Sequence, residues 1–465
     1  MHSSETIKGA AGLLSDEPIV AISTPPGRGA IGLVRLSGPS ASLDSILKQV
    51  VEGSSGSSVP DRQAQLVVLV DPESRERIDQ GILVRFAAPR SYTGEDVAEL
   101  SLHGSPVVLD AALSALRRAG ARLAQPGEFT RRAVLNGKMN LVEAEAVEAL
   151  ISAEDEAAAR LARRHLGGEL CGRIQEWRGE LLAAAAAVEA LVDFPEEVEA
   201  QEVEEQLQSL PTRRAEIEAL GHSFHAGRRV VQGWRLALVG PVNAGKSTLF
   251  NLLLDWDRAI VSPQPGTTRD VVSETVDWDG VALRIEDTAG FRDARDSVER
   301  EGIERSGSAV RQADLVLNVR DARLLVGEQG LSEVKEIEGS GQLSLAVATH
   351  SDLLGEQELD RLVAEGWHLV AAPSARGIAA LRSAILAEVH RSSPRDELMV
   401  HTARQHRGLM EAANHLAEAV NHGLHEPALM AVAISTAARV LHELVEPWDN
   451  EELLDEVFAR FCIGK

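Results

Sequence analysis

A short glycine-rich segment near the middle of the chain combines the residue types that bind phosphate groups. An apolar run precedes it and a helical run, residues 248–254, follows it; the segment itself is Gly240-Pro241-Val242-Asn243-Ala244-Gly245-Lys246-Ser247. Glycines at this spacing let backbone amides wrap phosphate oxygens, and the start of the helix adds unpaired amides. Lys246 then neutralises the β- and γ-phosphates, and Ser247 offers a hydroxyl to Mg²⁺. The segment therefore predicts a nucleotide phosphate loop, with further contacts from Ala244, Gly245 and Thr248.

Two further motifs follow in the order in which nucleotide switch proteins use them. Asp287-Thr288-Ala289-Gly290 comes after an apolar strand, where the carboxylate can hold the water shell of the metal and the glycine amide can sense the γ-phosphate. The polar loop before it is Pro265-Gly266-Thr267-Thr268-Arg269-Asp270. Thr268 can complete the Mg²⁺ shell, and Arg269 is a catalytic candidate. This order predicts the two switches of a GTPase.

The motif that distinguishes guanine from other bases departs from its usual form. GTPases usually carry Asn-Lys-x-Asp after the next strand, and the matching segment here is Thr349-His350-Ser351-Asp352. Asp352 keeps the carboxylate that accepts from the guanine ring, while Thr349 and His350 replace the amide and the lysine stem. The segment Ser374-Ala375-Arg376-Gly377 suits a loop that offers a backbone amide to the guanine oxygen. We expect guanine specificity with weaker affinity; an ATPase is the alternative.

The chain ends on a thiol and a cation that have no obvious packing purpose. The tetrapeptide Cys462-Ile463-Gly464-Lys465 follows an amphipathic run, residues 453–461, whose apolar face can dock the chain end. A final Lys argues against a prenylation motif. Cys462 is either a catalytic or redox thiol or a packed side chain, and the sequence leaves these alternatives open.

Composition limits the class of protein and the partners. The chain has 465 residues, a formal charge of −24 and two cysteines, which favours two or three globular domains and excludes a disulfide framework. Neither a signal sequence nor a run of eighteen apolar residues is found, so we expect a cytoplasmic protein without membrane contact. Because an acidic surface repels a phosphate backbone, an RNA substrate would have to be held by a basic partner. The run of glutamates between residues 196 and 205 is most simply a solvated helix face or a connector.

Changes in residue pattern along the chain indicate four segments. Short β-rich runs with one helix predict an α+β domain over residues 1–135, and Ala/Glu/Leu/Arg periodicity predicts long helices over residues 136–232, interrupted near Pro195 and Pro211. Buried-strand runs alternate with helices over residues 233–395, which is typical of a doubly wound α/β sheet. Helical periodicity returns over residues 396–465, so the α/β domain is inserted into a helical one.

Together with the phosphate loop, several motifs make the chain resemble the MnmE (TrmE) family of tRNA-modifying GTPases over nearly its whole length. They are residues 24–30, Tyr92-Thr93-Gly94-Glu95-Asp96-Val97, Pro126-Gly127-Glu128-Phe129-Thr130, residues 135–138, residues 287–292 and the terminal Phe461-Cys462-Ile463-Gly464-Lys465. The resemblance implies a homodimer formed by N-terminal domains, a helical domain and an inserted Ras-like G domain. It also implies a flavoprotein partner, MnmG, that holds most of the tRNA, and an aminomethyl-type product at carbon 5 of the wobble uridine.

The resemblance also implies roles for residues that the chain alone would leave unassigned. A 5-formyl-tetrahydrofolate site, or one for a related one-carbon folate, falls on Arg35, Glu99, Lys138 and Lys465. Glu299 matches the residue that orients the attacking water. The K⁺ that accompanies pairing of G domains matches Asn243, Ser262, Gln264 and Thr267.

Two other functions remain as alternatives. An Era-like switch in ribosome assembly would use hydrolysis only to time association, but it would call for a basic RNA-binding domain that this acidic chain lacks after the G region. A structural paralogue with weakened nucleotide binding would follow from the changes at Thr349 and His350.

Overall fold

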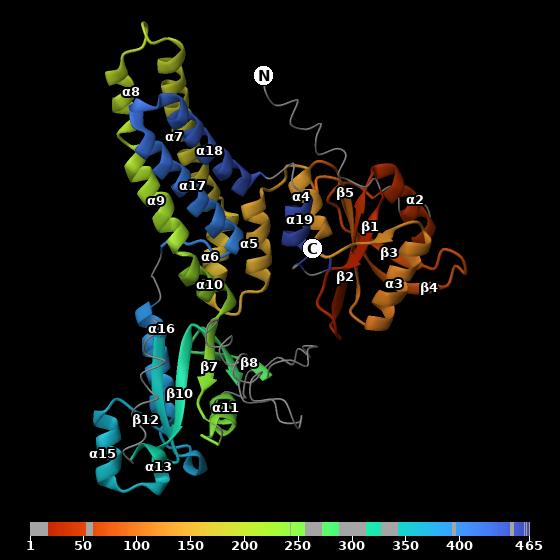
Figure 1. Ribbon diagram of the computed structural model, residues 1–465. Helices are drawn as coiled ribbons and strands as arrows, with labels where there is room; N and C mark the ends of the chain where they lie inside the picture. The colour runs from red at the N-terminus through yellow and green to blue at the C-terminus, as the bar shows by residue number, and fades with distance from the viewer. Residues whose placement is uncertain are drawn as a thin grey trace, which may run out of the picture. The chain divides into compact units, whose positions relative to one another are not determined.

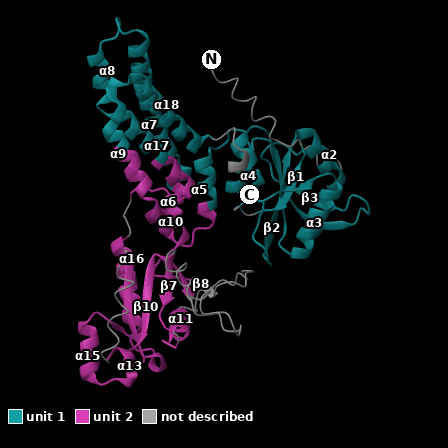
Figure 2. Cartoon of the chain, in the orientation of Figure 1, with its two compact units in different colours: residues 1–148, 164–214, 411–465 teal, residues 149–163, 215–410 magenta. Residues whose placement is uncertain are grey.

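The computed structural model describes residues 17–52, 59–241, 243–255, 272–287, 313–326, 343–392, 397–446, 451–459, 461 and 463–464. Its contacts divide the chain into two compact units (Figure 2). The first contains residues 1–148, 164–214 and 411–465, and the second contains residues 149–163 and 215–410.

A six-stranded sheet forms the N-terminal part of the first unit (Figure 1). Its order is β3-β4-β5-β2-β1-β6, made of β1 (Ile19–Ile22), β2 (Ile31–Gly38), β3 (Gln65–Val70), β4 (Arg77–Phe86), β5 (Asp96–His103) and β6 (Arg122–Leu123). Helices α2 (Ser40–Val50) and α3 (Pro106–Arg118) pack on one face, where Val34 and Leu36 of β2 are buried. Because side chains alternate along a strand, Leu33 and Arg35 lie on the opposite face. The predicted α+β domain is confirmed.

The chain end is docked within this unit. Helix α19 (Glu451–Phe458) packs against α4 (Glu128–Leu135), and Phe458 and Phe461 join Val134 and Leu135 in one buried cluster. Leu454, Phe458 and Phe461, which belong to the apolar face predicted for residues 453–461, are therefore buried as expected.

Buried ion pairs hold the start of α4. The Arg132 side chain is 3% exposed, and its guanidinium lies 2.9 Å from Glu95 Oε2 and 3.1 Å from Glu128 Oε1. Burial, the largest single influence, would raise the pKa of Glu128. Hydrogen bonds from Arg122 and the Gln125 amide, together with the charges of Arg122 and Arg132, outweigh it and hold that pKa below its ordinary value. These pairs fix the Glu95 motif against α4.

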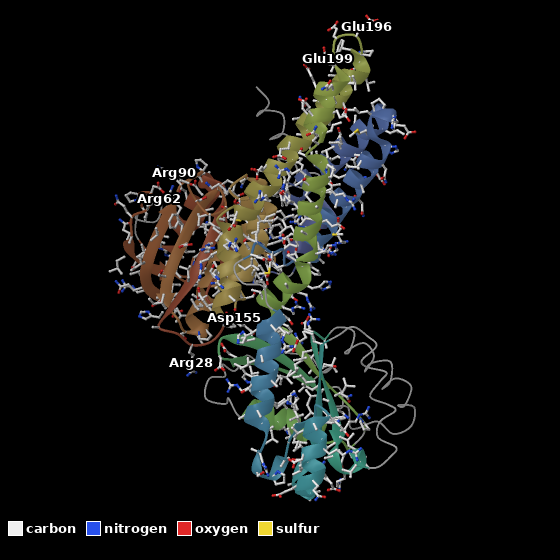
Figure 3. The ribbon with its side chains drawn as sticks, turned by 90° about the vertical axis from the view of Figure 1, so that its left-hand side faces the viewer. Arg28, Arg62, Arg90, Asp155, Glu196 and Glu199 are labelled. Carbon is white, nitrogen blue, oxygen red and sulfur yellow. The ribbon has the colours of Figure 1, made fainter. Side chains whose placement is uncertain are left out.

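Long helices follow. Their bounds are α5 (Leu141–Ile151), α6 (Glu156–Leu166), α7 (Glu169–Asp193), α8 (Ala200–Leu207), α9 (Leu210–His222), α10 (Phe224–Gln232), α17 (Ala403–His422), η4 (Gly423–His425) and α18 (Pro427–Val445). Helix α7 ends before Pro195, and Pro211 lies in the first turn of α9, which confirms the predicted interruptions. Glu196 and Glu199 extend into solvent where α7 gives way to α8 (Figure 3). Helix α18 is long and apolar enough to cross a membrane, but its buried face packs against α7.

The second unit contains a six-stranded sheet of the doubly wound type, as predicted. Its order is β12-β11-β10-β7-β9-β8, made of β7 (Trp234–Val239), β8 (Val272–Trp278), β9 (Val281–Asp287), β10 (Leu315–Asp321), β11 (Leu343–Thr349) and β12 (His368–Leu369). The surrounding helices are α11 (Lys246–Asp255), α13 (Ala322–Leu325), η2 (Ser351–Leu353), α15 (Glu356–Ala364), η3 (Ala372–Ser374) and α16 (Ile378–Ser392). All pairings are parallel except that of the edge strand β8 with β9. The carboxyl ends of five strands therefore meet at one edge, where such sheets bind ligands.

Candidate functional site

The phosphate loop joins β7 to α11 at the carboxyl edge of the second sheet. A Cβ on Gly240 would lie 2.0 Å from the Val319 carbonyl oxygen of β10, so only glycine lets the loop leave β7 this close to its neighbour. Helix α11 begins at Lys246 and directs its first amides into the loop. The amide donors, the positive end of the helix and the close approach all fit a bound phosphate chain.

The ammonium group of Lys246 lies inside this loop. The residue is buried, and Nζ donates to the carbonyl oxygens of Gly240 at 2.7 Å and Pro241 at 2.8 Å. Ser247 and Thr248 are exposed in the first turn of α11, and Asn243 is exposed at the top of the loop with φ of 66°. The loop thus combines one buried cation with exposed hydroxyl and amide side chains.

The second switch motif begins beside the phosphate loop. In the parallel pairing of β7 with β9, Asp287 lies opposite Leu238, two residues before Gly240. The other predicted switch and metal residues lie outside the described part of the chain: Ser262, Gln264, Thr267, Thr268, Arg269, Thr288, Ala289, Gly290 and Glu299. Their roles remain predictions.

The two loops predicted to read guanine lie together. They follow the adjacent parallel strands β11 and β12, and the Ser351 amide donates to the Val370 carbonyl oxygen at 3.2 Å. Asp352, Ser374 and Arg376 are exposed, while Ala375 adopts a left-handed conformation with φ of 52°. One exposed carboxylate and the turn at residues 374–376 therefore share the edge of the sheet that carries the phosphate loop.

The residues expected to hold a folate lie in the first unit, and two of them contact each other. Arg35 and Glu99 are directly opposite in the β2–β5 pairing, with Nε of Arg35 2.8 Å from Glu99 Oε1. The guanidinium also lies 5.2 Å from the ring centre of Tyr92 and 5.8 Å from that of Phe129. The two rings pack against the guanidinium and hold it beside Glu99.

Lys138 and the chain end lie at two borders of this region. The exposed Lys138 packs its stem against Gly94, where an added Cβ would be 3.1 Å from Lys138 Cγ. Ser23, which follows β1, donates its hydroxyl proton to the Gly464 carbonyl oxygen at 3.0 Å. The Ser23 amide in turn donates to Leu33, two residues before Arg35. Lys465 and Cys462 lie outside the described residues.

Three residues in or near the candidate folate site were given no role from the sequence. Tyr92 and Phe129 belong to motifs that were recognised, but no pattern indicated that both rings would face Arg35. No sequence pattern indicated a role for Ser23, because its hydrogen-bond partner, Gly464, is 441 positions away along the chain.

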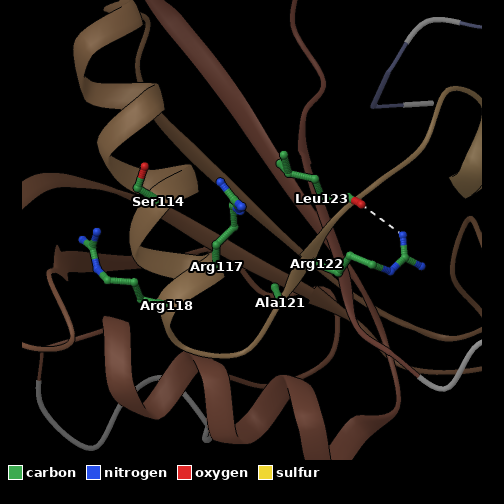
Figure 4. A pocket seen from close by; sticks show the side chains of 6 residues that line it. All are labelled: Ser114, Arg117, Arg118, Ala121, Arg122 and Leu123. Atoms are coloured by element: carbon green, nitrogen blue, oxygen red, sulfur yellow. Dashed lines mark hydrogen bonds between the residues drawn. The ribbon is translucent and has the colours of Figure 1, made fainter.

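Neither thiol chemistry nor anion binding is supported elsewhere in the described residues. Burial, with smaller contributions from Glu143 and Glu446, raises the pKa of Cys171 to about 11, so this thiol is unreactive. A cavity of about 520 Å³ is lined by Ser114, Arg117, Arg118, Ala121, Arg122 and Leu123 (Figure 4). Arg118 is paired with Asp71, and Arg122 with Glu17 and Glu128, so two of its three cations are already neutralised.

Known proteins resemble this chain over nearly its full length, including the segments that carry both candidate sites. The family model described as "GTP-binding protein TrmE N-terminus" matches residues 18–138, and the model described as "MnmE helical domain" matches residues 141–462. The tRNA modification GTPase MnmE of Aquifex aeolicus is 40% identical over 454 residues, covering 97% of this chain and 100% of that protein. A protein of the same name from Thermus thermophilus is 43% identical over 452 residues, covering 97% and 99%. The one from Ralstonia nicotianae is 38% identical over 485 residues and covers 100% of both chains. Since relatives this similar align over nearly the full length of both proteins, the chain belongs to the MnmE family.

Proposed function

We propose that this chain hydrolyses GTP and takes part in the modification of tRNA, the activity for which its full-length relatives are named. The observation that carries the proposal is the phosphate loop between β7 and α11, with Lys246 buried inside it. An acidic chain with a formal charge of −24 would act on tRNA through a partner that supplies the positive surface.

The donor set fits GTP with Mg²⁺. Backbone amides of residues 243–248 would hold the phosphates together with Lys246, and Ser247 and Thr268 would ligate the metal, with Asp287 in its water shell. Bound Mg²⁺ would neutralise charge that develops on the phosphate oxygens. Glu299 would orient the attacking water, and Arg269 is a further catalytic candidate.

The first unit would hold a one-carbon folate. Arg35, Lys138 and Lys465 would bind its carboxylates, while Glu99 would bond the amino edge of the pterin. The contacts of Arg35 with Tyr92 and Phe129 support this placement, because they hold its guanidinium beside Glu99. With the flavoprotein MnmG, the chain would install an aminomethyl or carboxymethylaminomethyl group at carbon 5 of the wobble uridine.

A second copy of the chain would cover exposed side chains on the face of the N-terminal sheet opposite α2 and α3. Ile31, Leu66 and Ile82 are 67%, 68% and 44% exposed, and Leu66 and Ile82 are paired across β3 and β4 on that face. Burying such side chains favours association. The mass of the purified chain in solution should therefore be twice its calculated 49.9 kDa; a monomeric mass would contradict the homodimer.

The test of the function is mass analysis of the wobble uridine in tRNA from cells that lack this chain. We expect the modified base to disappear and to return when the intact gene is supplied, but not when the supplied gene carries Lys246→Ala. A normal modified base together with defective ribosomal subunits would favour the Era-like alternative. Recovery of the protein in the soluble fraction of cells would support the expected cytoplasmic location.

Potassium should stimulate hydrolysis more than sodium. Asn243 is exposed in the phosphate loop. Its side-chain oxygen would bind a cation beside the phosphates. With Ser262, Gln264 and Thr267, it would form a site that suits the larger ion. Asn243→Ala should abolish the difference between KCl and NaCl at equal ionic strength, while GDP affinity changes little. Equal rates for the unaltered chain in both salts would contradict this assignment.

A further inference from the structure

Thr349, at the end of β11, contacts the phosphate loop directly. Its side chain is buried, and Oγ1 lies 2.7 Å from the Ala244 carbonyl oxygen and 3.0 Å from that of Arg320. A hydroxyl group has one proton to donate, and the shorter contact is the one to Ala244. A single buried side chain thus joins the phosphate loop to the ends of β10 and β11.

His350 contacts this hydroxyl and lies beside Asp321. His350 has a left-handed backbone with φ of 56°, and its Nδ1 lies 3.2 Å from Thr349 Oγ1 and 3.5 Å from Asp321 Oδ2. Both of these oxygens can accept a hydrogen bond, so the tautomer that satisfies them carries hydrogen on Nδ1. Asp321 remains a carboxylate, because hydrogen bonds from Arg323 hold its pKa below the ordinary value.

The peptide bond between Ala244 and Gly245 shows how these contacts affect the phosphate loop. In a trans peptide, the C=O of one residue and the N–H of the next point in opposite directions. Because the Ala244 carbonyl is directed at Thr349, the Gly245 amide is directed away from Thr349. A Cβ on Gly245 would lie 3.4 Å from Thr349 Oγ1 and 3.5 Å from His350 Cε1, so Gly245 packs against the same pair. The loop can rotate this peptide only by breaking the buried hydrogen bond.

We infer that Thr349 is a positioning residue of the phosphate loop, and that Asp321 and His350 orient its hydroxyl. The inference rests on the proposed placement of the nucleotide. In this role Thr349 supports binding of the phosphates and not of the base. Loss of its hydroxyl should therefore weaken the binding of every nucleoside triphosphate alike. The Thr in place of the usual Asn therefore keeps a hydrogen bond to the loop, and the reason for expecting weaker affinity no longer applies at this position.

The experiment measures binding of GTP, ITP and XTP to the full-length chain carrying Thr349→Val or Thr349→Ser. Valine keeps the shape but lacks the hydroxyl, so we expect all three nucleotides to bind roughly ten-fold more weakly. Serine keeps the hydroxyl and should restore binding. Ser383→Ala, which removes an exposed hydroxyl on α16, is the matched control and should change nothing. Unchanged affinity in Thr349→Val, or equal losses in the Val and Ser variants, would overturn the inference.

Two further variants separate this inference from the placement of the base. Asp352→Asn should exchange the preference for GTP with one for XTP; if it does not, the base placement is wrong, while the Thr349 result still stands. His350→Gly removes the imidazole without backbone strain and should reproduce part of the loss, whereas His350→Asn keeps a donor near the Nδ1 position and should not. Should Thr349→Val not fold, the same comparison of His350→Gly with His350→Asn decides the matter. Equal affinities in these two variants would then contradict the inference.

Discussion

Replacing Glu299 with Ala should lower the rate of GTP hydrolysis by roughly two to four powers of ten and leave GTP affinity nearly unchanged. A residue that orients the attacking water contributes to the transition state and makes little contact with the bound nucleotide. Single-turnover hydrolysis and equilibrium binding of a non-hydrolysable analogue, measured on the same preparation, separate the two quantities.

Two neighbouring carboxylates provide matched controls for this variant. Glu301→Ala and Glu304→Ala remove the same group from the same segment and should hydrolyse GTP at the normal rate. A fall in affinity that parallels the fall in rate for Glu299→Ala would show a structural role for Glu299. Similar losses in all three variants would mean that the segment, and not this carboxylate, matters for the reaction.

Most of the fold follows from local patterns. The phosphate-loop motif requires a strand before it and a helix after it, and the structure has both in β7 and α11. An apolar run likewise locates β10, whose residues from Leu315 to Val319 are all buried, as expected of a strand covered on both faces. Shorter apolar stretches indicate β9 and β11. No apolar run indicates β8, because its residues Val272–Trp278 mix charged and apolar side chains. It is an edge strand, where one side has no neighbour and the apolar pattern is weaker.

The sequence could not show which residues, far apart along the chain, contact each other in the candidate sites. Opposite charges at Arg35 and Glu99 were expected to bind a ligand, and only the register of β2 with β5 reveals that they also bind each other. Any ligand carboxylate must therefore compete with Glu99 for Arg35, which favours a ligand that satisfies both groups at once.

The altered guanine motif shows a second limit of prediction from the sequence. Comparison with the usual motif identifies which side chain has been lost at position 349, and a lost amide suggests a lost interaction. The hydrogen bond from Thr349 to Ala244 shows that a shorter side chain can serve the same loop when the loop itself comes within 2.7 Å. Spacing between residues 244 and 349 could not have predicted this distance.

Deleting Cys462 to Lys465 should abolish folate binding and tRNA modification but leave GTP hydrolysis largely intact. The proposed folate residues and the docked end belong to the first unit, whereas Lys246 and the described part of the phosphate loop belong to the second. Lys465→Ala alone removes one cation and should weaken folate binding by about 1.5 to 3 kcal/mol, the usual worth of a charge-assisted hydrogen bond. Calorimetric titration of folate into each variant measures these losses.

Gly464→Ala tests the docking without removing any charge. Gly464 has φ of 97°, and a Cβ there would lie 2.4 Å from the Ile22 carbonyl oxygen, so alanine cannot occupy this position without displacing the chain end. We expect this variant to lose folate affinity as the deletion does. Ile463→Ala is the matched control, because that side chain is 59% exposed and its truncation should have no effect. Normal folate binding in Gly464→Ala would show that the docked end does not serve the folate site. Normal folate binding with lost modification in Cys462→Ser would instead assign the thiol a chemical role.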